Sequence, residues 1–280
     1  MPDVSRMARL VAVAVVMGIG IVNLYWAVTA WTLSDAQAYW DAAQRVRAGL
    51  DLYPVVGNVD ASEVYRYAPW FAWLAVPFTL LPVQVAGALW SAILLVASGI
   101  ALVPMIRARA WLLVGFFAPI LVGISAVGNV QALMIAPLVW GVERRSGPIW
   151  IALAASLKIF PILLVAVYLG RREWARAALA VIAAAALWAP ALLYDLRGYA
   201  TDPGQAGSLF AYPWLWVVAV GAGLVVTRRL ARSTYGWLAA ATTVVLALPR
   251  LFVYDVTYLM VGLPDGSRRA SSQATTRNAR

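Results

Sequence analysis

The feature that most constrains this chain is a succession of apolar stretches, several of them long enough to cross a bilayer. Residues 10–31 are almost uninterruptedly apolar, and a helix needs about 20 such residues to span the hydrocarbon core. Further apolar stretches follow from residue 69 onward, with approximate limits 69–82, 84–106, 110–127, 130–142, 147–169, 175–194, 212–227, 234–249 and 251–263. The pattern predicts an all-α, polytopic membrane protein with about nine or ten transmembrane helices in one domain over residues 10–263.

Composition excludes most other classes of protein. Hydrophobic residues make up 63% and charged residues 12% of the chain, whereas a soluble domain carries about 45–50% and about 25%. The mean hydropathy is +0.79. A soluble globule, a disordered chain, a collagen and a coiled coil are therefore excluded. Cysteine and histidine are both absent, which removes disulfides, thiolate and imidazole metal sites, cysteine nucleophiles and Ser-His triads. Any chemistry rests on Asp, Glu, Arg, Tyr and the single lysine, and no metal or cofactor is expected.

The basic residues indicate membrane orientation rather than a nucleic-acid partner, although the net charge is +10. Arginines stand in small groups between the apolar stretches, which is the usual bias of cytoplasmic loops. The groups are Arg6 and Arg9, Arg107 and Arg109, Arg144 and Arg145, Arg171 to Arg176, and Arg228 to Arg232. Residues 1–9 and a disordered tail over 264–280 are expected in the cytoplasm. The preference for arginine over lysine favours a GC-rich bacterium, so the expected location is the bacterial plasma membrane.

The stretch at 147–169 conflicts with simple alternation of spans. Alternation would place Arg144 and Arg145 on the side opposite Arg171 and Arg172, while the positive-inside rule wants both pairs in the cytoplasm. Pro161 interrupts the stretch between them. A broken or re-entrant helix would reconcile the two, and non-helical backbone at membrane depth is tolerated only where it is shielded from lipid or lines a cavity. The span count between residues 128 and 175 therefore stays open.

The longest polar segment, residues 32–68, is expected to be a large first loop on the extracytoplasmic side. Its net charge is −2, from Asp35, Asp41, Asp51, Asp60 and Glu63 against Arg45, Arg47 and Arg66. Residues 36–48 predict a short interfacial helix, because apolar side chains recur along one side. Ser34 and Asp35 are expected as its N-terminal caps, and Gly49 as its end.

A set of ordered motifs resembles glycosyltransferase family 87, the polyprenol-phosphate-mannose-dependent mannosyltransferases with a GT-C fold. In this chain the motifs are Asp35-x-x-x-Tyr39, Gly49-Leu50-Asp51-Leu52-Tyr53, Tyr67-Ala68-Pro69, Gly128-Asn129-Val130-Gln131, Leu157-Lys158-Ile159-Phe160-Pro161, and Pro249-Arg250 followed by Tyr254-Asp255. None is specific alone, but their order and spacing cover residues about 20 to 260. The chain is shorter than most family members, and residues 195–235 are compressed.

The resemblance implies a membrane hexosyltransferase. It would move a hexose, with mannose as the expected sugar, from a polyprenyl-phosphate donor to an extracytoplasmic lipid or glycan acceptor, with inversion. Asp35 would be the general base for the acceptor hydroxyl. One carboxylate suffices because a polyprenyl phosphate is already a good leaving group, whereas glycoside hydrolases need a second carboxyl to protonate theirs. The expected substrate-binding residues are Tyr39, Arg66, Tyr67, Asn129, Gln131, Lys158 and Asp255.

Each of these residues also has a purely structural interpretation. Asp35 could be only a helix cap, and Asp41 could cap or pair with Arg45. Gly128, Asn129 and Gln131 could break a helix instead of binding a sugar. Arg66 and Tyr67 could hold a phosphate or serve as interfacial anchors.

The intramembrane charges carry similar alternatives. A lysine within an apolar stretch is energetically unfavourable and is usually functional. Lys158 could contact the lipid phosphate, pair with Asp255, or extend its ammonium group from a short helix end to the interface. Asp255 could form an ion pair with Arg250 or act at the donor site.

Two other functions stay open. A transporter or flippase usually places ionisable residues at the membrane midplane in two repeats, but here the acids gather in one loop and no repeat is evident. A catalytically inactive GT-C-like relative is compatible with the short chain.

Overall fold

The computed structural model describes residues 33–58, 64–199 and 207–263, together with Met7, Leu10, Ala14 and Gly18. Every regular element in these ranges is a helix, which confirms the all-α prediction. The α-helices are α2 (Ser34–Arg47), α3 (Pro69–Ala75), α4 (Val83–Arg107), α5 (Trp111–Ala126), α6 (Gln131–Gly141), α7 (Gly147–Leu157), α8 (Val165–Arg171), α9 (Trp174–Trp188), α10 (Pro213–Leu230) and α11 (Gly236–Ala247). The 3-10 helices are η1 (Val76–Leu80), η2 (Phe160–Leu164), η3 (Ala189–Leu193), η4 (Leu196–Gly198), η5 (Leu209–Ala211) and η6 (Val253–Gly262). Apart from those four residues, the expected segments 1–9, 10–31 and 264–280 lie outside the described residues.

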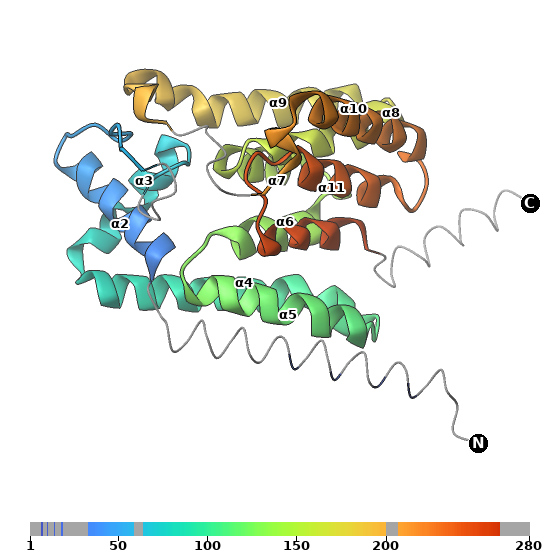
Figure 1. Ribbon diagram of the computed structural model, residues 1–280, viewed down its shortest axis with the longest axis horizontal. Helices are drawn as coiled ribbons and strands as arrows, with labels where there is room; N and C mark the ends of the chain where they lie inside the picture. Colours follow the sequence, from blue (N-terminus) through green and yellow to red (C-terminus); the bar gives the residue numbers. More distant parts are fainter. Residues whose placement is uncertain are drawn as a thin grey trace, which may run out of the picture.

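The long helices run side by side along the molecule, with α2 and α3 grouped at one end (Figure 1). Three described helices are long and apolar enough to cross a membrane: Val83–Arg107, Trp174–Leu193 and Pro213–Leu230. Six further apolar helices have 10–17 residues. The count of nine or ten spans and the GT-C topology therefore stay predictions.

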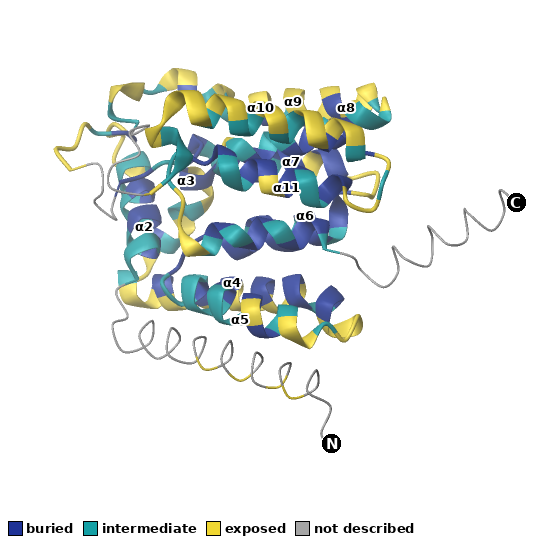
Figure 2. Cartoon of the chain, turned by 45° about the vertical axis from the view of Figure 1, so that its right-hand side comes forward, coloured by how far each residue is buried: buried dark blue, intermediate teal, exposed yellow. Residues whose placement is uncertain are grey.

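The outer helices expose apolar side chains, as a bilayer environment requires. In α10 the side chains of Trp214 and Val218 are 86% and 66% exposed, and Figure 2 shows exposed residues along α9 and α10, above the more buried α6, α7 and α11. Monomeric soluble proteins rarely expose contiguous apolar patches larger than a few hundred Å². These helices are therefore suited to face lipid.

The stretch at 147–169 is a broken helix, as predicted. Helix α7 ends at Leu157, and Lys158 adopts an extended backbone with φ −137° and ψ 119°. The chain then continues through η2 into α8. Pro161 has no N–H with which to continue the α-helical ladder back to the carbonyl of Leu157. The break thus lies at Lys158, just before the proline, and places this lysine on non-helical backbone.

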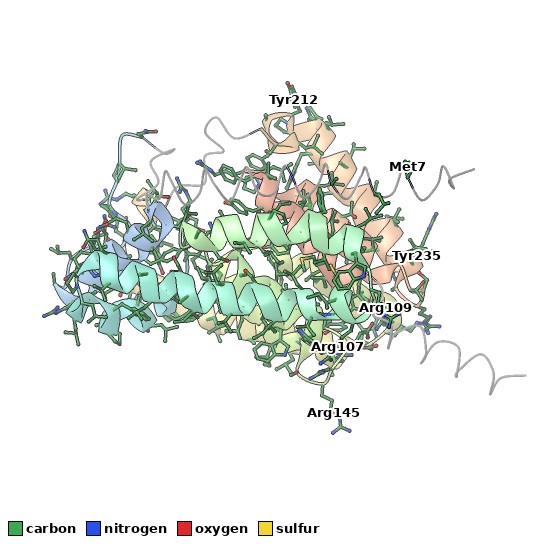
Figure 3. The ribbon with its side chains drawn as sticks, turned by 90° about the horizontal axis from the view of Figure 1, so that it is seen from below. Met7, Arg107, Arg109, Arg145, Tyr212 and Tyr235 are labelled. Carbon is green, nitrogen blue, oxygen red and sulfur yellow. The ribbon has the colours of Figure 1, made fainter. Side chains whose placement is uncertain are left out.

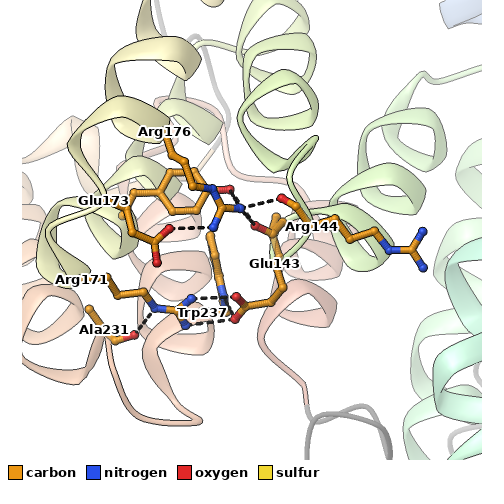
Figure 4. Close-up of polar contacts among 9 residues, drawn as sticks. Glu143, Arg144, Arg171, Glu173, Arg176, Ala231 and Trp237 are labelled. Atoms are coloured by element: carbon orange, nitrogen blue, oxygen red, sulfur yellow. Dashed lines mark hydrogen bonds and ion pairs between the residues drawn. The ribbon is translucent and has the colours of Figure 1, made fainter. Parts of the chain in front are cut away.

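The break returns the chain to the end from which α7 started. Glu143, before α7, forms an ion pair with Arg171, the last residue of α8, at 2.7 Å. Arg176 Nη2 donates to the carbonyl oxygen of Arg144 at 2.6 Å (Figure 4). Arg107, Arg109 and Arg145 project from the same end of the molecule in Figure 3. The two arginine pairs that alternation would have separated therefore lie together at one basic end.

Helix α2 confirms the short helix expected in the first loop, but its capping differs. Leu33 is the N-cap residue, in a left-handed conformation with φ 42°, and no side chain caps the helix. The expectation that Ser34 and Asp35 are caps is therefore wrong, because both already lie in the first turn. A carboxylate there still interacts favourably with the helix dipole. Gly49 ends the helix as expected, with φ 66°.

Candidate active site

A glycine between α5 and α6 brings two distant segments into contact. Gly128 has φ 89°, and a Cβ atom there would lie 2.6 Å from the Cβ atom and 2.9 Å from the backbone nitrogen of Ala36. The indole of Trp90 donates to the carbonyl oxygen of Gly128 at 2.7 Å and fixes the loop. Only a residue without a side chain permits this approach. It places Asn129 beside the first turn of α2.

The carboxyl group of Asp35 lies at this contact and is partly buried. Burial raises its pKa above the ordinary value of 3.8. A hydrogen bond from Asn129 and the positive charges of Lys158 and Arg66 act in the opposite direction, but burial outweighs them. Asp35 is therefore a stronger base than an aspartate in water, and it faces cationic groups.

Lys158, at the helix break, is held from several sides. Its ammonium nitrogen lies 3.0 Å from Asp255 Oδ1 and 3.1 Å from Gln131 Oε1. It also lies 4.6 Å from the ring centroid of Tyr254. The second carboxylate oxygen of Asp255 accepts from the backbone N–H of Phe252 at 2.9 Å. Lys158 thus forms an ion pair with Asp255, which is one of the roles that the sequence left open for the lysine. The partner of Asp255 is therefore Lys158 and not Arg250, which was the other candidate.

The polar residues at the start of α6 are buried and hydrogen-bonded. Asn129 is 2% and Gln131 0% exposed. The Asn129 side-chain oxygen accepts from the backbone N–H of Gln131 at 2.9 Å. Gln131 Nε2 donates to Thr257 Oγ1 at 3.0 Å, and that hydroxyl donates to the carbonyl oxygen of Tyr254 at 2.7 Å. The hydrogen bond between Gln131 and Thr257 thus joins α6 to η6, next to the ammonium group of Lys158.

Two tyrosines line the same region from α2 and from the segment before α3. Tyr39 donates its hydroxyl proton to the Tyr67 hydroxyl oxygen at 3.0 Å and accepts from the backbone N–H of Val130 at 3.3 Å. Both side chains are buried, and burial is the main reason that the pKa of each phenol lies well above 10. Both are therefore protonated at neutral pH.

Arg66 reaches the site from the loop that precedes α3. Its Nη1 donates to the carbonyl oxygen of Val64 at 3.3 Å, and its own carbonyl oxygen accepts from Tyr199 at 3.3 Å. Its positive charge acts on the carboxyl group of Asp35. Hydrogen bonds and an ion pair thus join Asn129, Gln131, Lys158 and Asp255, and a hydrogen bond joins Tyr39 to Tyr67. Arg66 acts on Asp35 through its charge.

Some features of the site were not expected from the sequence. Tyr254 as a platform for the lysine, and Thr257 as a support for Gln131, were both missed. Polar residues inside the last apolar stretch were the available signal. Asp41, for which a cap or a pairing with Arg45 was considered, accepts a hydrogen bond from Gln37 at 2.9 Å. Among the described residues no group of three or more His, Cys, Asp or Glu side chains could hold a metal ion.

Comparison with protein families gives a match over part of the chain. The model of glycosyltransferase family 87 matches residues 65–201, which is the family that the sequence motifs resemble. The matched segment includes Arg66, Tyr67, Asn129, Gln131 and Lys158. No curated protein and no solved structure matches the chain.

Proposed function

From the match to glycosyltransferase family 87, which implies a membrane glycosyltransferase, we propose a finer assignment for this chain. It moves a hexose, with mannose as the expected sugar, from a polyprenyl-phosphate carrier to a lipid or glycan acceptor outside the cytoplasm. The observation that carries the proposal is the position of Asp35. Its partly buried carboxyl group has a raised pKa and feels the charges of two cations, Lys158 and Arg66.

Asp35 acts on the acceptor. As the acceptor oxygen attacks the anomeric carbon, the carboxylate takes the hydroxyl proton. The bond between that carbon and the phosphate oxygen breaks, and its electron pair leaves with the polyprenyl phosphate. A single displacement inverts the anomeric configuration. The leaving phosphate needs no protonation, so the chemistry is complete with one carboxylate, unlike that of the glycoside hydrolases.

Lys158 and Arg66 act on the donor phosphate. Asp255 and Gln131 accept two hydrogen bonds from the Lys158 ammonium group, which has one further N–H to offer. The lysine side chain keeps 18% of its surface exposed, while Asp255 keeps 1%. A cation fixed in this way stabilises negative charge as it develops, without reorganising during the reaction.

The orientation of the site in the membrane follows from the basic end. Figure 1 shows α2, which contains Asp35, and α8, which ends at Arg171, at opposite ends of the molecule. Arg171 pairs with Glu143. Basic loops favour the cytoplasm. The proposal therefore places Asp35 on the extracytoplasmic side, where a lipid-linked sugar rather than a nucleotide sugar is the donor.

The test is transfer by membranes that contain wild type, Asp35→Asn or Asp41→Asn at matched levels. Labelled polyprenyl-phosphate mannose and a native lipid extract serve as donor and acceptor. Asp41 lies in the same helix and accepts a hydrogen bond from Gln37, and it was not among the residues expected in catalysis or binding, so its variant is the matched control. We expect transfer by wild type and Asp41→Asn and none by Asp35→Asn. Full transfer by Asp35→Asn would refute the proposed mechanism.

A further inference from the structure

A hydrogen-bond chain with a fixed direction leads into the proposed site. It begins at the backbone N–H of Val130, which can only donate, and its acceptor is the hydroxyl oxygen of Tyr39 at 3.3 Å. The Tyr39 hydroxyl in turn donates a hydrogen bond to the hydroxyl oxygen of Tyr67 at 3.0 Å. The backbone N–H can only donate, and in this structure the Tyr39 hydroxyl is the donor to Tyr67, which gives the order of donors and acceptors along the chain.

The last proton of this chain has no acceptor in the part of the protein that the structure describes. Tyr67 is 8% exposed, and the charges that act on its hydroxyl include Asp35 and Lys158. A buried O–H group that donates to nothing is unfavourable. The hydroxyl of Tyr67 is therefore suited to donate to an oxygen atom that arrives with a ligand.

The ring of Tyr67 is held in place. Tyr53 donates its hydroxyl proton to the carbonyl oxygen of Tyr67 at 2.7 Å. The ring centroid of Tyr67 lies 5.1 Å from that of Tyr39, edge to face, and 5.6 Å from those of Phe71 and Tyr65. This aromatic packing holds the ring and its hydroxyl oxygen in place, where the charges of Asp35 and Lys158 act on the hydroxyl.

We propose that Tyr67 donates a hydrogen bond to a phosphate oxygen of the lipid carrier, and that Tyr39 is the positioning residue that fixes the direction of this bond. The inference rests on the proposed function and deepens it. A phosphate oxygen only accepts hydrogen bonds, which matches a Tyr67 hydroxyl that already accepts from Tyr39 and still has its own proton to donate. A sugar hydroxyl also needs to donate. The neighbouring cations, Arg66 and Lys158, favour the same anionic group.

The test uses purified full-length protein in detergent with undecaprenyl phosphate and, as the phosphate-free comparison, undecaprenol. Binding is measured by tryptophan fluorescence for wild type, Tyr67→Phe, Tyr39→Phe and the double variant. A hydrogen bond to a charged group contributes about 1.5–3 kcal/mol. We therefore expect Tyr67→Phe to weaken undecaprenyl phosphate binding about 10- to 100-fold, with undecaprenol binding unchanged.

The double variant distinguishes positioning from general destabilisation. If Tyr39 acts through Tyr67, Tyr39→Phe weakens binding in the wild-type background and has no further effect in Tyr67→Phe. Tyr168→Phe is the structural control, because that phenol is also buried and donates to the carbonyl oxygen of Val142 at 2.6 Å, far from the site. It should lower thermal stability and leave undecaprenyl phosphate affinity unchanged.

Two results would overturn the inference: unchanged undecaprenyl phosphate affinity in Tyr67→Phe, or fully additive effects of the two substitutions. Its failure is separable from that of the proposed function. Binding that depends on Tyr67 without any mannose transfer by wild type would remove the proposed function and keep the phosphate site. Normal transfer by wild type with an unchanged undecaprenyl phosphate affinity in Tyr67→Phe would keep the proposed function and remove the phosphate-binding role of Tyr67.

Discussion

The buried pair of Lys158 and Asp255 permits a test that separates stability from chemistry. Asp255→Asn leaves the lysine charge facing a neutral amide, while the new side chain can still accept from the Phe252 N–H. Lys158→Met leaves a carboxylate that is 1% exposed with only that N–H as a partner. Breaking a buried ion pair from one side lowers the free energy of unfolding by about 3–5 kcal/mol, because an uncompensated charge stays buried.

The expected loss in the free energy of unfolding differs between the Asp255 and Lys158 variants. Lys158 retains 18% of its surface and keeps Gln131 and the Tyr254 ring, so Asp255→Asn should fall near the lower end, about 3 kcal/mol. Lys158→Met should fall near the upper end, about 5 kcal/mol. The double variant removes both charges and retains the bond to Phe252. It should lose much less than the sum of the two single losses.

The assay is equilibrium unfolding in mixed detergent micelles, followed by tryptophan fluorescence, with transfer measured on the same preparations. If the losses of the single variants simply add in the double variant, the pair does not contribute as a pair and the reasoning is refuted. In the proposed function Lys158 also contacts the donor phosphate. The double variant should therefore recover stability without recovering transfer, and recovery of both would make Lys158 purely structural.

Further expectations concern pH, the loop glycine and the basic end. Transfer needs the Asp35 carboxylate, so kcat/KM should fall as pH falls through its raised pKa; an acid limb centred below 3.8 would contradict the burial argument. The same raised pKa means that folding disfavours the ionised form, so Asp35→Asn should raise the thermal midpoint measured near neutral pH, and a lower midpoint would count against it. Gly128→Ala should reduce the free energy of unfolding by more than about 1–2 kcal/mol, because alanine is strained in the left-handed conformation and its Cβ atom would overlap with α2. Gly99 has open space around it, so Gly99→Ala should be neutral or slightly stabilising in the same unfolding assay. Glu143→Gln should lower stability by about 1 kcal/mol, since its ion pair with Arg171 is partly exposed; chemical denaturation that shows no change would assign no stabilising role to that pair.

Several properties of the protein could be predicted from the sequence because they depend on local composition. The length of the apolar stretches predicts a membrane protein made of helices. Pro161 predicts a break in one of them, since a proline removes a backbone donor wherever it stands. The family match over residues 65–201 confirms the resemblance drawn from short motifs. Hydrogen bonds and an ion pair also join most of the residues expected at the site, although their catalytic and binding roles stay predictions.

The partners within the site were decided only by the tertiary structure. Arg250 is the nearer basic residue to Asp255 in sequence, but the observed partner is Lys158, 97 residues away. Gln131 meets Thr257 across 126 residues, and Tyr39 is bonded both to Tyr67 and to the backbone N–H of Val130 in a third segment. The N-cap at Leu33 could not be read from cap preferences either, because α2 begins without a side-chain cap. Apolar length is a local property of the chain, whereas the geometry of an ion pair or a hydrogen bond depends on which segments pack together.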